Sequence, residues 1–314
     1  MTRIIFMGTP DFSVPILERL IKSEHQVVAV VTQPDRPKGR KRQLAASPVK
    51  QAAQAYEIPV YQPEKLSDEL DEILAIEADI IITAAYGQLL PEKLLQYPKF
   101  GCINVHASLL PELRGGAPIH YAILEGKKET GITIMYMAKK LDAGDIISQE
   151  AVTIEADDHV GTLHDKLSRV GANLLETTLP SIFEQQNNRT KQDEAKATFA
   201  PNITREQEKI DWHLDHYAIY NHIRGLHPWP VAYTLFEGER MKIWWGERNE
   251  HTFSKAKPGE IVAIDDNQHH ITVACGDSHG INLTMIQPAG KKRLQMKDFL
   301  KGNPNVFQIG QIME

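Results

Sequence analysis

Cysteine is nearly absent from this sequence of 314 residues. The only two, Cys102 and Cys275, can build neither a disulfide framework nor a zinc cluster of thiolates by themselves. No apolar run approaches the roughly 18 residues that a membrane span needs, and the first apolar segment, 3–7, is too short for a signal-peptide core. These absences predict a cytoplasmic protein that does not enter a membrane.

A strong excess of charge of one sign is also missing. The chain has 35 Lys and Arg residues against 41 Asp and Glu residues, a formal net charge of −6. This total neither supports nor excludes RNA binding, because local patches decide which phosphate contacts form. With 42% hydrophobic residues, the composition is that of a globular protein and excludes wholesale disorder or a fibre.

In the first half of the chain, short runs rich in Ile and Val alternate with helix-like stretches such as 15–22 and 67–76. This alternation predicts an α/β domain whose Rossmann-like parallel sheet carries helices on both faces. The predicted strands are 3–7, 26–32, 79–84, 101–106 and 131–137. Ligands of such sheets lie beyond the carboxyl ends of the strands, where loops lead into the following helices.

The second half has a different pattern. A polar segment, 186–196, nearly lacks large apolar side chains and resembles a linker. After a short helix at about 214–224, five strand-like runs follow at 231–236, 241–247, 259–263, 270–274 and 281–287. We therefore predict a catalytic domain of residues 1–187, a linker of residues 188–207 and a smaller β-barrel of residues 208–314, for which the oligonucleotide-binding barrel is a precedent.

Asn104 and His106 stand near the carboxyl end of a predicted strand. Residues two apart in a strand share a face, so the amide and the imidazole project together. This pair suits acyl transfer, in which an amide N–H stabilises the developing oxyanion and a histidine moves the proton. A carboxylate would hold the histidine ring, and Asp142 and Asp145 are both candidates. Alternatively, Asn104 caps the strand and His106 is a structural histidine.

Directly after His106 stands Ser-Leu-Leu-Pro-Glu-Leu-Arg-Gly-Gly-Ala-Pro, residues 108–118. Together with the preceding Asn-x-His, this segment closely resembles the signature of the folate-dependent formyltransferases. The resemblance implies that Asn104, His106 and Asp142 are catalytic and that 10-formyltetrahydrofolate is the formyl donor. It also implies that folate is held by Ser108, Leu109, Leu110 and Pro111, with Tyr86, Gly87 and Leu89 lining the pocket.

The loop after the first predicted strand, residues 6–12, is not a dinucleotide-binding loop. It has one glycine where that fingerprint needs three, so NAD and FAD are not expected. The folate-dependent formyltransferases carry a similar Gly-Thr-Pro-Asp-Phe segment near their acceptor site.

The segment 34–50 is basic, with six Lys and Arg residues and one Asp. Such a cluster suits contact with phosphates, although many charge runs are only solvated surface. Its Pro-Asp-Arg-Pro-Lys-Gly-Arg stretch resembles the loop of those formyltransferases that act on methionyl-tRNA. The resemblance implies tRNA contacts by Arg36, Lys38, Arg40, Lys41 and Arg42, and in the barrel by Lys291, Lys292 and Arg293.

The sequence thus predicts formyl transfer to the methionine amino group of initiator methionyl-tRNA, in support of translation initiation. The enzymatic alternatives are formyl transfer to a nucleotide-linked amino sugar or to glycinamide ribonucleotide. The alternative of another class is a non-catalytic protein that binds RNA or folate. No spacing among the thirteen histidines matches a zinc helix or knuckle, so no metal is predicted. No obligatory protein partner is expected either.

Overall fold

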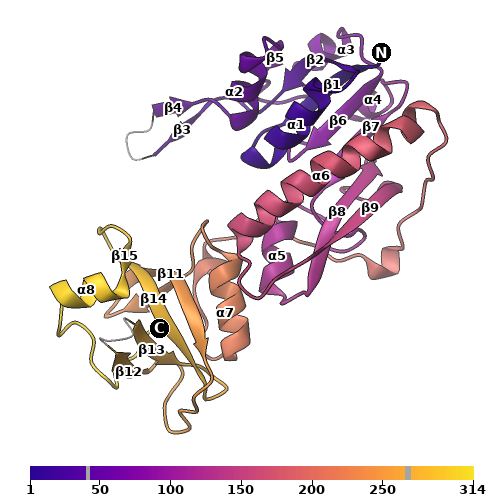
Figure 1. The fold of residues 1–314 in the computed structure, drawn as a ribbon. Coiled ribbons are helices and arrows are strands. Elements are labelled where there is room, and N and C mark those ends of the chain that lie inside the picture. The colour runs from indigo at the N-terminus through magenta and orange to yellow at the C-terminus, as the bar shows by residue number, and fades with distance from the viewer. Residues whose placement is uncertain (40–42, 266–269) are drawn as a thin grey trace. The chain divides into compact units, whose positions relative to one another are not determined.

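The computed structural model describes residues 1–39, 43–265 and 270–314. The chain divides into two compact units (Figure 1). Unit 1 contains Met1–Pro118, Glu129–Thr153 and His164–Pro201, and unit 2 contains Ile119–Lys128, Ile154–Leu163 and Asn202–Glu314. Among the described residues, no helix combines the length and the apolar character that crossing a membrane requires.

Unit 1 is built on a seven-stranded sheet with the order β5-β2-β1-β6-β7-β8-β9. The first five of these strands run parallel to one another, which confirms the predicted parallel-rich sheet. In chain order the strands are β1 (Arg3–Gly8), β2 (Gln26–Val31), β5 (Val60–Tyr61), β6 (Ile80–Ala84), β7 (Cys102–His106), β8 (Glu129–Tyr136) and β9 (Ile146–Thr153).

The parallel direction predicted for the strand 131–137 was wrong. This strand corresponds to β8, which runs antiparallel to β7 and to β9. Hydrophobic alternation has the same period in both directions, so it could not reveal this reversal. As a result, the end of β8 lies beside the start of β7, where Tyr136 pairs with Ile103.

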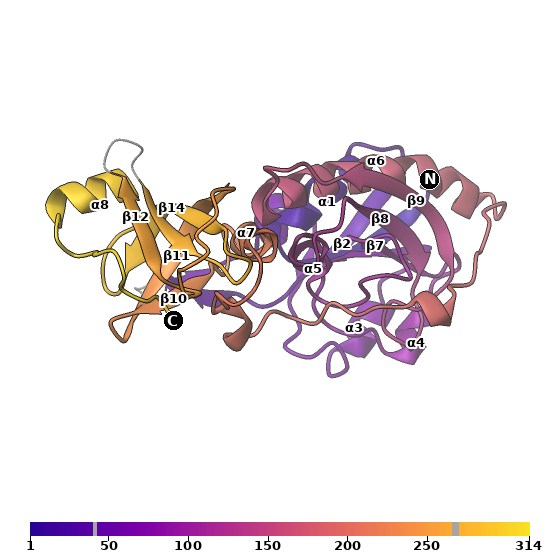
Figure 2. The same cartoon turned by 90° about the horizontal axis from the view of Figure 1, so that it is seen from below.

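Helices cover both faces of this sheet (Figure 2). On one face lie α3 (Leu70–Leu74) and α4 (Glu92–Leu95), whose Ile73 and Leu94 are fully buried against the sheet. On the other face lie α1 (Val14–Ile21), which follows the short helix η1 (Asp11–Ser13), and the long α6 (Val160–Phe183). The central strands β1 and β6 are buried on both faces, as in a sheet that helices cover on both sides; every residue of β6 is buried. Ser47 caps the N-terminus of the helix α2 (Pro48–Ala55), because its side chain accepts a hydrogen bond from the Lys50 amide.

Residues 188–201, the larger part of the predicted linker, lie on unit 1. Thr190 pairs with Ile146 at the start of β9, and Phe199 pairs with Arg114. Between them stands the short helix η2 (Glu194–Lys196). The segment is polar because its side chains form hydrogen bonds and ion pairs with other residues of unit 1. From composition alone, such a segment looks the same as a solvated linker.

Unit 2 is an antiparallel sheet with the order β10-β11-β14-β13-β12. Its elements are η3 (Glu206–Glu208), α7 (His216–Gly225), β10 (Tyr233–Phe236), β11 (Glu239–Asn249), β12 (Ile261–Asp265), β13 (His270–Ala274), β14 (Gly280–Pro288), β15 (Leu294–Gln295) and α8 (Met296–Gly302). Residues 119–128 of the same unit carry most of α5 (Pro118–Leu124).

The C-terminal residues connect the two edges of this sheet. Met313 pairs with Phe236 of β10, and Ile312 pairs with Glu260 just before β12. This segment therefore closes the sheet, which confirms the predicted barrel and leaves the two edges paired. Apolar side chains from several strands, among them Ile243, Ile271 and Leu283, fill the interior together with Ile219 and Ile223 of α7.

Candidate active site

Asn104 lies in the middle of unit 1, on β7 beside Thr83 of β6. The Thr83 hydroxyl lies 2.7 Å from Asn104 Oδ1 and donates a hydrogen bond to it. In this arrangement the amide carbonyl of Asn104 faces Thr83, and the Nδ2 group faces the other way. The Nδ2 group has no hydrogen-bond partner among the described residues, so it is available to a ligand.

His106, at the end of β7, is 5% exposed. Its Nε2 lies 3.1 Å from the carbonyl oxygen of Leu113. A carbonyl only accepts, so Nε2 must carry a proton and donate it. Leu113 is held in the left-handed region at φ 58°, a conformation that costs about 1 to 3 kcal/mol for a residue other than glycine. The bond leaves Nδ1 as the nitrogen of His106 that can gain or lose a proton.

Asp142 faces that nitrogen. Its Oδ2 lies 3.8 Å from His106 Nδ1 and accepts a 2.9 Å hydrogen bond from the Gly115 amide. The other candidate, Asp145, instead forms an ion pair with Arg189 at 3.2 Å. The geometry therefore places Asp142, and not Asp145, beside His106, which stands two residues along β7 from Asn104.

A loop, and not the end of a parallel strand, carries Asp142 to this place. After β8 the chain makes an excursion over residues 137–145 before β9 begins, and Asp142 within it has φ 48°. Gly144 is required in this turn because a Cβ there would lie 1.8 Å from the Tyr136 carbonyl oxygen. The turn is thus held close to the last residue of β8.

A hydrogen-bond network around the buried guanidinium of Arg114, which the sequence did not reveal, supports the same turn. Gln192 Nε2 donates to the carbonyl oxygens of Asp142 and Gly144, both at 2.8 Å. Gln192 Oε1 in turn accepts from the fully buried guanidinium of Arg114 at 2.8 and 3.0 Å. Arg114 belongs to the motif at 108–118, but Gln192 lies in the polar segment that was predicted to be a linker. No signal in the sequence therefore marked Gln192 as part of the site.

Glu194 completes this network. Arg114 and Lys140 both bond to its carboxylate. These hydrogen bonds lower the pKa of Glu194 to about 2, so the carboxylate stays charged at any pH at which the protein works. A buried guanidinium without such partners would be strongly destabilising.

The segment predicted to hold folate, residues 108–111, is tied to β8 and β9. Ser108 is fully buried, and its hydroxyl donates to the Glu112 carbonyl at 2.6 Å. The Leu110 carbonyl accepts from Gln149 at 2.9 Å. Ser108 therefore shapes the loop through its own hydrogen bond, and Leu109 and Pro111 are the more accessible members of the segment.

The second predicted folate segment follows β6. Tyr86 is 4% exposed, and burial raises the pKa of its hydroxyl to about 12, so the side chain stays neutral. Gly87 has φ 92°, which turns the chain so that Leu89 is 70% exposed. Leu141, in the loop of Asp142, is 49% exposed. Exposed apolar side chains in these two loops are suited to cover the flat ring of a ligand.

Cys102 is not a nucleophile in this site. Burial raises the pKa of its thiol to about 12, and its Sγ contacts the Leu94 carbonyl oxygen at 3.4 Å. A thiol of this pKa carries almost no thiolate near neutral pH. Cys102 therefore packs as a small buried residue under the sheet's helices.

The basic segment of unit 1 forms a hairpin of β3 (Arg36–Lys38) and β4 (Gln43–Ala45), which projects from the sheet of unit 1 (Figure 1). The predicted tRNA contacts Arg40, Lys41 and Arg42 lie outside the described residues. Arg36 is exposed and forms an ion pair with Glu64 at 2.7 Å. At the base, Asp35 accepts from Gln62 and from Lys50, both at 2.8 Å. The hydrogen bonds from Gln62 and Lys50 lower the pKa of Asp35.

The predicted tRNA contacts of unit 2 lie together in the turn between β14 and β15. Lys291, Lys292 and Arg293 are all exposed. The Arg293 guanidinium stacks over the ring of Trp244, 4.7 Å from its centroid. The Trp244 indole N–H donates to Gln287 at 3.0 Å, so Trp244 holds the arginine at the surface.

Comparison with known proteins connects this geometry with a function. Residues 2–179 match the family described as formyl transferase, and residues 202–304 match the formyl transferase C-terminal domain. A methionyl-tRNA formyltransferase of Halalkalibacterium halodurans is 56% identical over 313 residues, which cover 99% of this chain and 98% of the relative. The chain belongs to the methionyl-tRNA formyltransferase family. That of Bacillus subtilis is 58% identical over 304 residues, with 96% and 95% of the two chains covered.

Solved structures with lower identity share the fold of this formyltransferase. The sugar 3N-formyltransferase WlaRD, solved with 5-N-formyl-THF, has a TM-score of 0.67 at 19% identity and covers 93% of this chain and 99% of its own. An N-formyltransferase of Helicobacter canadensis, solved with folinic acid and dTDP-3-aminofucose, has a TM-score of 0.69 at 18% identity, with 92% and 100% covered. At such identities the likeness concerns the fold alone, so the alternative of an amino-sugar acceptor is not favoured.

Proposed function

We propose that this formyltransferase takes the formyl group of 10-formyltetrahydrofolate and transfers it to the methionine amino group of initiator methionyl-tRNA, and that Asn104, His106 and Asp142 carry out the reaction. The arrangement of these three side chains at one end of β7 supports the proposal most directly. The family relationship supports the choice of acceptor, and the cytoplasm, where charged tRNA is found, is the proposed location. The reaction as proposed requires no protein partner.

Asn104 stabilises the charge that develops in the transfer. When the amine attacks the formyl carbon, negative charge forms on the formyl oxygen, and Asn104 Nδ2 can donate a hydrogen bond to it. Thr83 occupies the Asn104 carbonyl and so keeps the donor directed at the ligand. A donor fixed before the reaction costs no reorganisation at the moment of attack.

His106 moves the proton, and Asp142 supports it. The attacking amine must lose a proton and the departing folate nitrogen must gain one. Nδ1 of His106 can take the first proton and return it, because Nε2 is already bonded to Leu113. The 3.8 Å gap to Asp142 is longer than a hydrogen bond, so a substrate group or water can bridge the two. The imidazolium formed in between is stabilised by the charge of Asp142.

The two units contribute differently in this proposal. Unit 1 carries the reaction and the folate segments 86–89 and 108–111, while its paired strands β3 and β4 approach the acceptor end of the tRNA. The turn of Lys291, Lys292 and Arg293 in unit 2 contacts tRNA phosphates. Such contacts hold an RNA in register without reading its sequence.

The experiment that tests the function is transfer of labelled formyl from 10-formyltetrahydrofolate to initiator methionyl-tRNA. Elongator methionyl-tRNA, glycinamide ribonucleotide and a nucleotide-linked amino sugar serve as parallel acceptors. Selective formylation of the initiator is expected. Turnover on one of the small amines but not on the tRNA would overturn the proposed acceptor while leaving the chemistry intact.

Removing charge from the unit 2 turn should weaken tRNA binding without changing the chemical step. For a protein with Lys291→Ala and Lys292→Ala, we expect tRNA binding to depend less steeply on salt. The slope of the logarithm of the association constant against the logarithm of the salt concentration should become less negative by about one for each phosphate that the protein no longer neutralises. The KM for tRNA should rise while kcat stays the same. The matched control replaces two exposed lysines of unit 1, Lys22→Ala and Lys99→Ala. An equal effect of the control would mean that only net charge matters.

Gln192 is expected to act as a positioning residue. Gln192→Ala removes both hydrogen bonds that hold the Asp142 turn, and we expect kcat to fall by about tenfold with little change in the KM for tRNA, since misplacement by about 1 Å can cost more than that. Gln192→Glu, which keeps the length but lacks the N–H donors, should behave in the same way. Full activity in both variants of a folded protein would show that the turn holds Asp142 by itself.

A further inference from the structure

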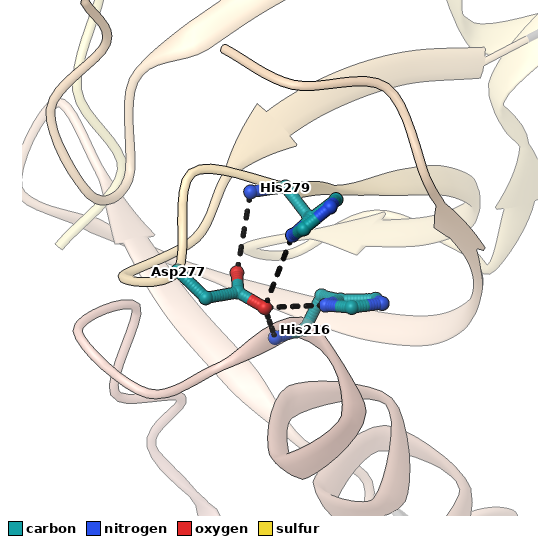
Figure 3. A group of neighbouring side chains, drawn as sticks. All are labelled: His216, Asp277 and His279. Carbon is teal, nitrogen blue, oxygen red and sulfur yellow. Dashed lines mark hydrogen bonds and ion pairs between the residues drawn. The ribbon is translucent and has the colours of Figure 1, made fainter. Parts of the chain in front are cut away.

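Three side chains of unit 2 that formyl transfer does not use lie close together. His216 is the first residue of α7, and Asp277 and His279 belong to the turn between β13 and β14. One nitrogen or oxygen atom from each lies within 4.8 Å of the others. Figure 3 shows both imidazole rings turned toward the carboxylate of Asp277. His216 and Asp277 are 61 positions apart, so no local spacing in the sequence could mark the group, and no metal was predicted.

The distances within this cluster are close to those of a coordination sphere. Asp277 Oδ2 lies 3.3 Å from His279 Nδ1 and 2.5 Å from His216 Nδ1. Around tetrahedral zinc, with metal–ligand bonds of about 2.0 to 2.2 Å, neighbouring ligand atoms are about 3.3 Å apart. The first pair already has this separation, and the second would have to open by about 0.8 Å, which a small rotation of the carboxylate can supply.

One ring nitrogen of the buried His216 has no hydrogen-bond partner among the described residues. Its side chain is 4% exposed, and Nδ1 bonds to Asp277. A neutral ring with its proton on Nδ1 turns the bare lone pair of Nε2 toward the Glu250 carboxylate, 3.2 Å away. Nε2 is indeed a buried nitrogen without a hydrogen bond to any described residue. The same holds for Nδ1 of His279.

A metal ion on Nδ1 would resolve this conflict. With the lone pair of Nδ1 on the metal, the proton of His216 stands on Nε2 and can be donated to Glu250. A ligating histidine whose other nitrogen donates to a carboxylate is the usual arrangement in protein metal sites. Glu250 Oε2 lies 3.2 Å from this nitrogen, and a small change in its side-chain direction would make it the outer partner.

Both carboxylate oxygens of Asp277 are held by the neighbouring histidines. Its Oδ2 lies 2.5 Å from His216 Nδ1, and its Oδ1 accepts a hydrogen bond from the His279 amide at 3.2 Å. The turn that carries it is rigidly built: the Cys275 amide bonds to the His279 carbonyl at 2.8 Å, and Ser278 has φ 67°. The side chains of Asp277 and His279 are 27% and 31% exposed, which leaves one side open to a water ligand.

We propose that His216, Asp277 and His279 bind one divalent ion of the zinc type, through two imidazole Nδ1 atoms, one carboxylate oxygen and a water. Imidazole and carboxylate together suit zinc, cobalt and nickel. The ion would fasten the start of α7 to the β13–β14 turn. The site is separate from the residues of formyl transfer, so this proposal and the proposed function can fail independently.

The test is a titration of the full-length protein, freed of metal by a chelator, with Zn²⁺ and with Co²⁺. We expect one equivalent to bind at micromolar protein concentration, visible d–d absorption of the cobalt form, and a Tm that rises with Zn²⁺ because only the folded state has the site. Asp277→Asn and His279→Ala should each lower the affinity by at least about a hundredfold, and Glu250→Gln by about tenfold.

His213→Ala is the matched control. This histidine stands three residues before His216, its side chain is 81% exposed, and it pairs with Asp211 instead of the cluster. Its loss should leave the titration unchanged. No stoichiometric binding by the folded wild-type protein would overturn the proposal. Binding that persists in Asp277→Asn and His279→Ala would equally overturn it, because the metal would then occupy another histidine.

Discussion

Replacing Asn104 by Ala or by Asp is expected to lower kcat by at least about a hundredfold, the effect of losing one preorganised donor to an oxyanion. Ala removes the Nδ2 group. Asp keeps the shape of the side chain but presents an oxygen where a donor is needed. Both losses should appear in kcat at saturating tRNA and folate, because the hydrogen bond is made only as charge develops. The measurement is steady-state formyl transfer with the purified, folded variants.

Thr83→Val is the control for this assignment. The variant keeps the shape of the side chain but no longer donates to Asn104 Oδ1, so the amide can turn over while Nδ2 remains present. We expect a smaller loss of about tenfold, consistent with the misplacement of a catalytic group that is still there. Near-normal turnover of Asn104→Ala would show that Asn104 only caps β7, which is the structural alternative.

Asp142→Asn is the second substitution with a large expected effect, again at least about a hundredfold in kcat. The amide oxygen of Asn can still accept from the Gly115 amide, so the turn should persist. What is lost is the negative charge that stabilises the imidazolium of His106. The substitution thus separates the electrostatic role of Asp142 from its structural role. Formyl transfer to initiator methionyl-tRNA, with unfolding followed in parallel, measures both.

Asp145→Asn provides the comparison. Asp145 belongs to the same turn and was a candidate by its position after a predicted strand, but it pairs with the exposed Arg189. Surface ion pairs contribute little, commonly below about 1 kcal/mol, so turnover should stay near that of the wild type. If Asp145→Asn lost activity while Asp142→Asn retained it, the assignment of the carboxylate would be reversed.

The agreement of the proposed chemistry with the fold depends on a few particular contacts. The hydrogen bond from Thr83 orients Asn104, the carbonyl of Leu113 sets the protonated nitrogen of His106, and the loop after β8 supplies Asp142. Each contact joins segments that are distant in the chain or held in an uncommon backbone conformation. The catalytic residues can therefore be named from a motif, but their protonation and orientation cannot.

Local patterns in the sequence were sufficient for a large part of this protein. Runs such as 79–84 and 101–106 are rich in Ile and Val and predict buried strands, which β6 and β7 are. The spacing of Asn104 and His106 places them on one strand face, and the segment 108–118 indicates the family. These features follow from the sequence alone because strand periodicity and short motifs depend only on neighbouring residues.

The tertiary structure decided the rest. It set the direction of β8, the contact of Asp142 with His106, and the place of residues 188–201 on unit 1. It also closed the barrel with the C-terminal residues and brought His216 to Asp277. All of these depend on which way the chain returns and on hydrogen bonds between segments far apart in sequence. Hydrophobic alternation is identical for both strand directions, and a polar side chain looks the same in a sequence whether it meets water or a buried partner.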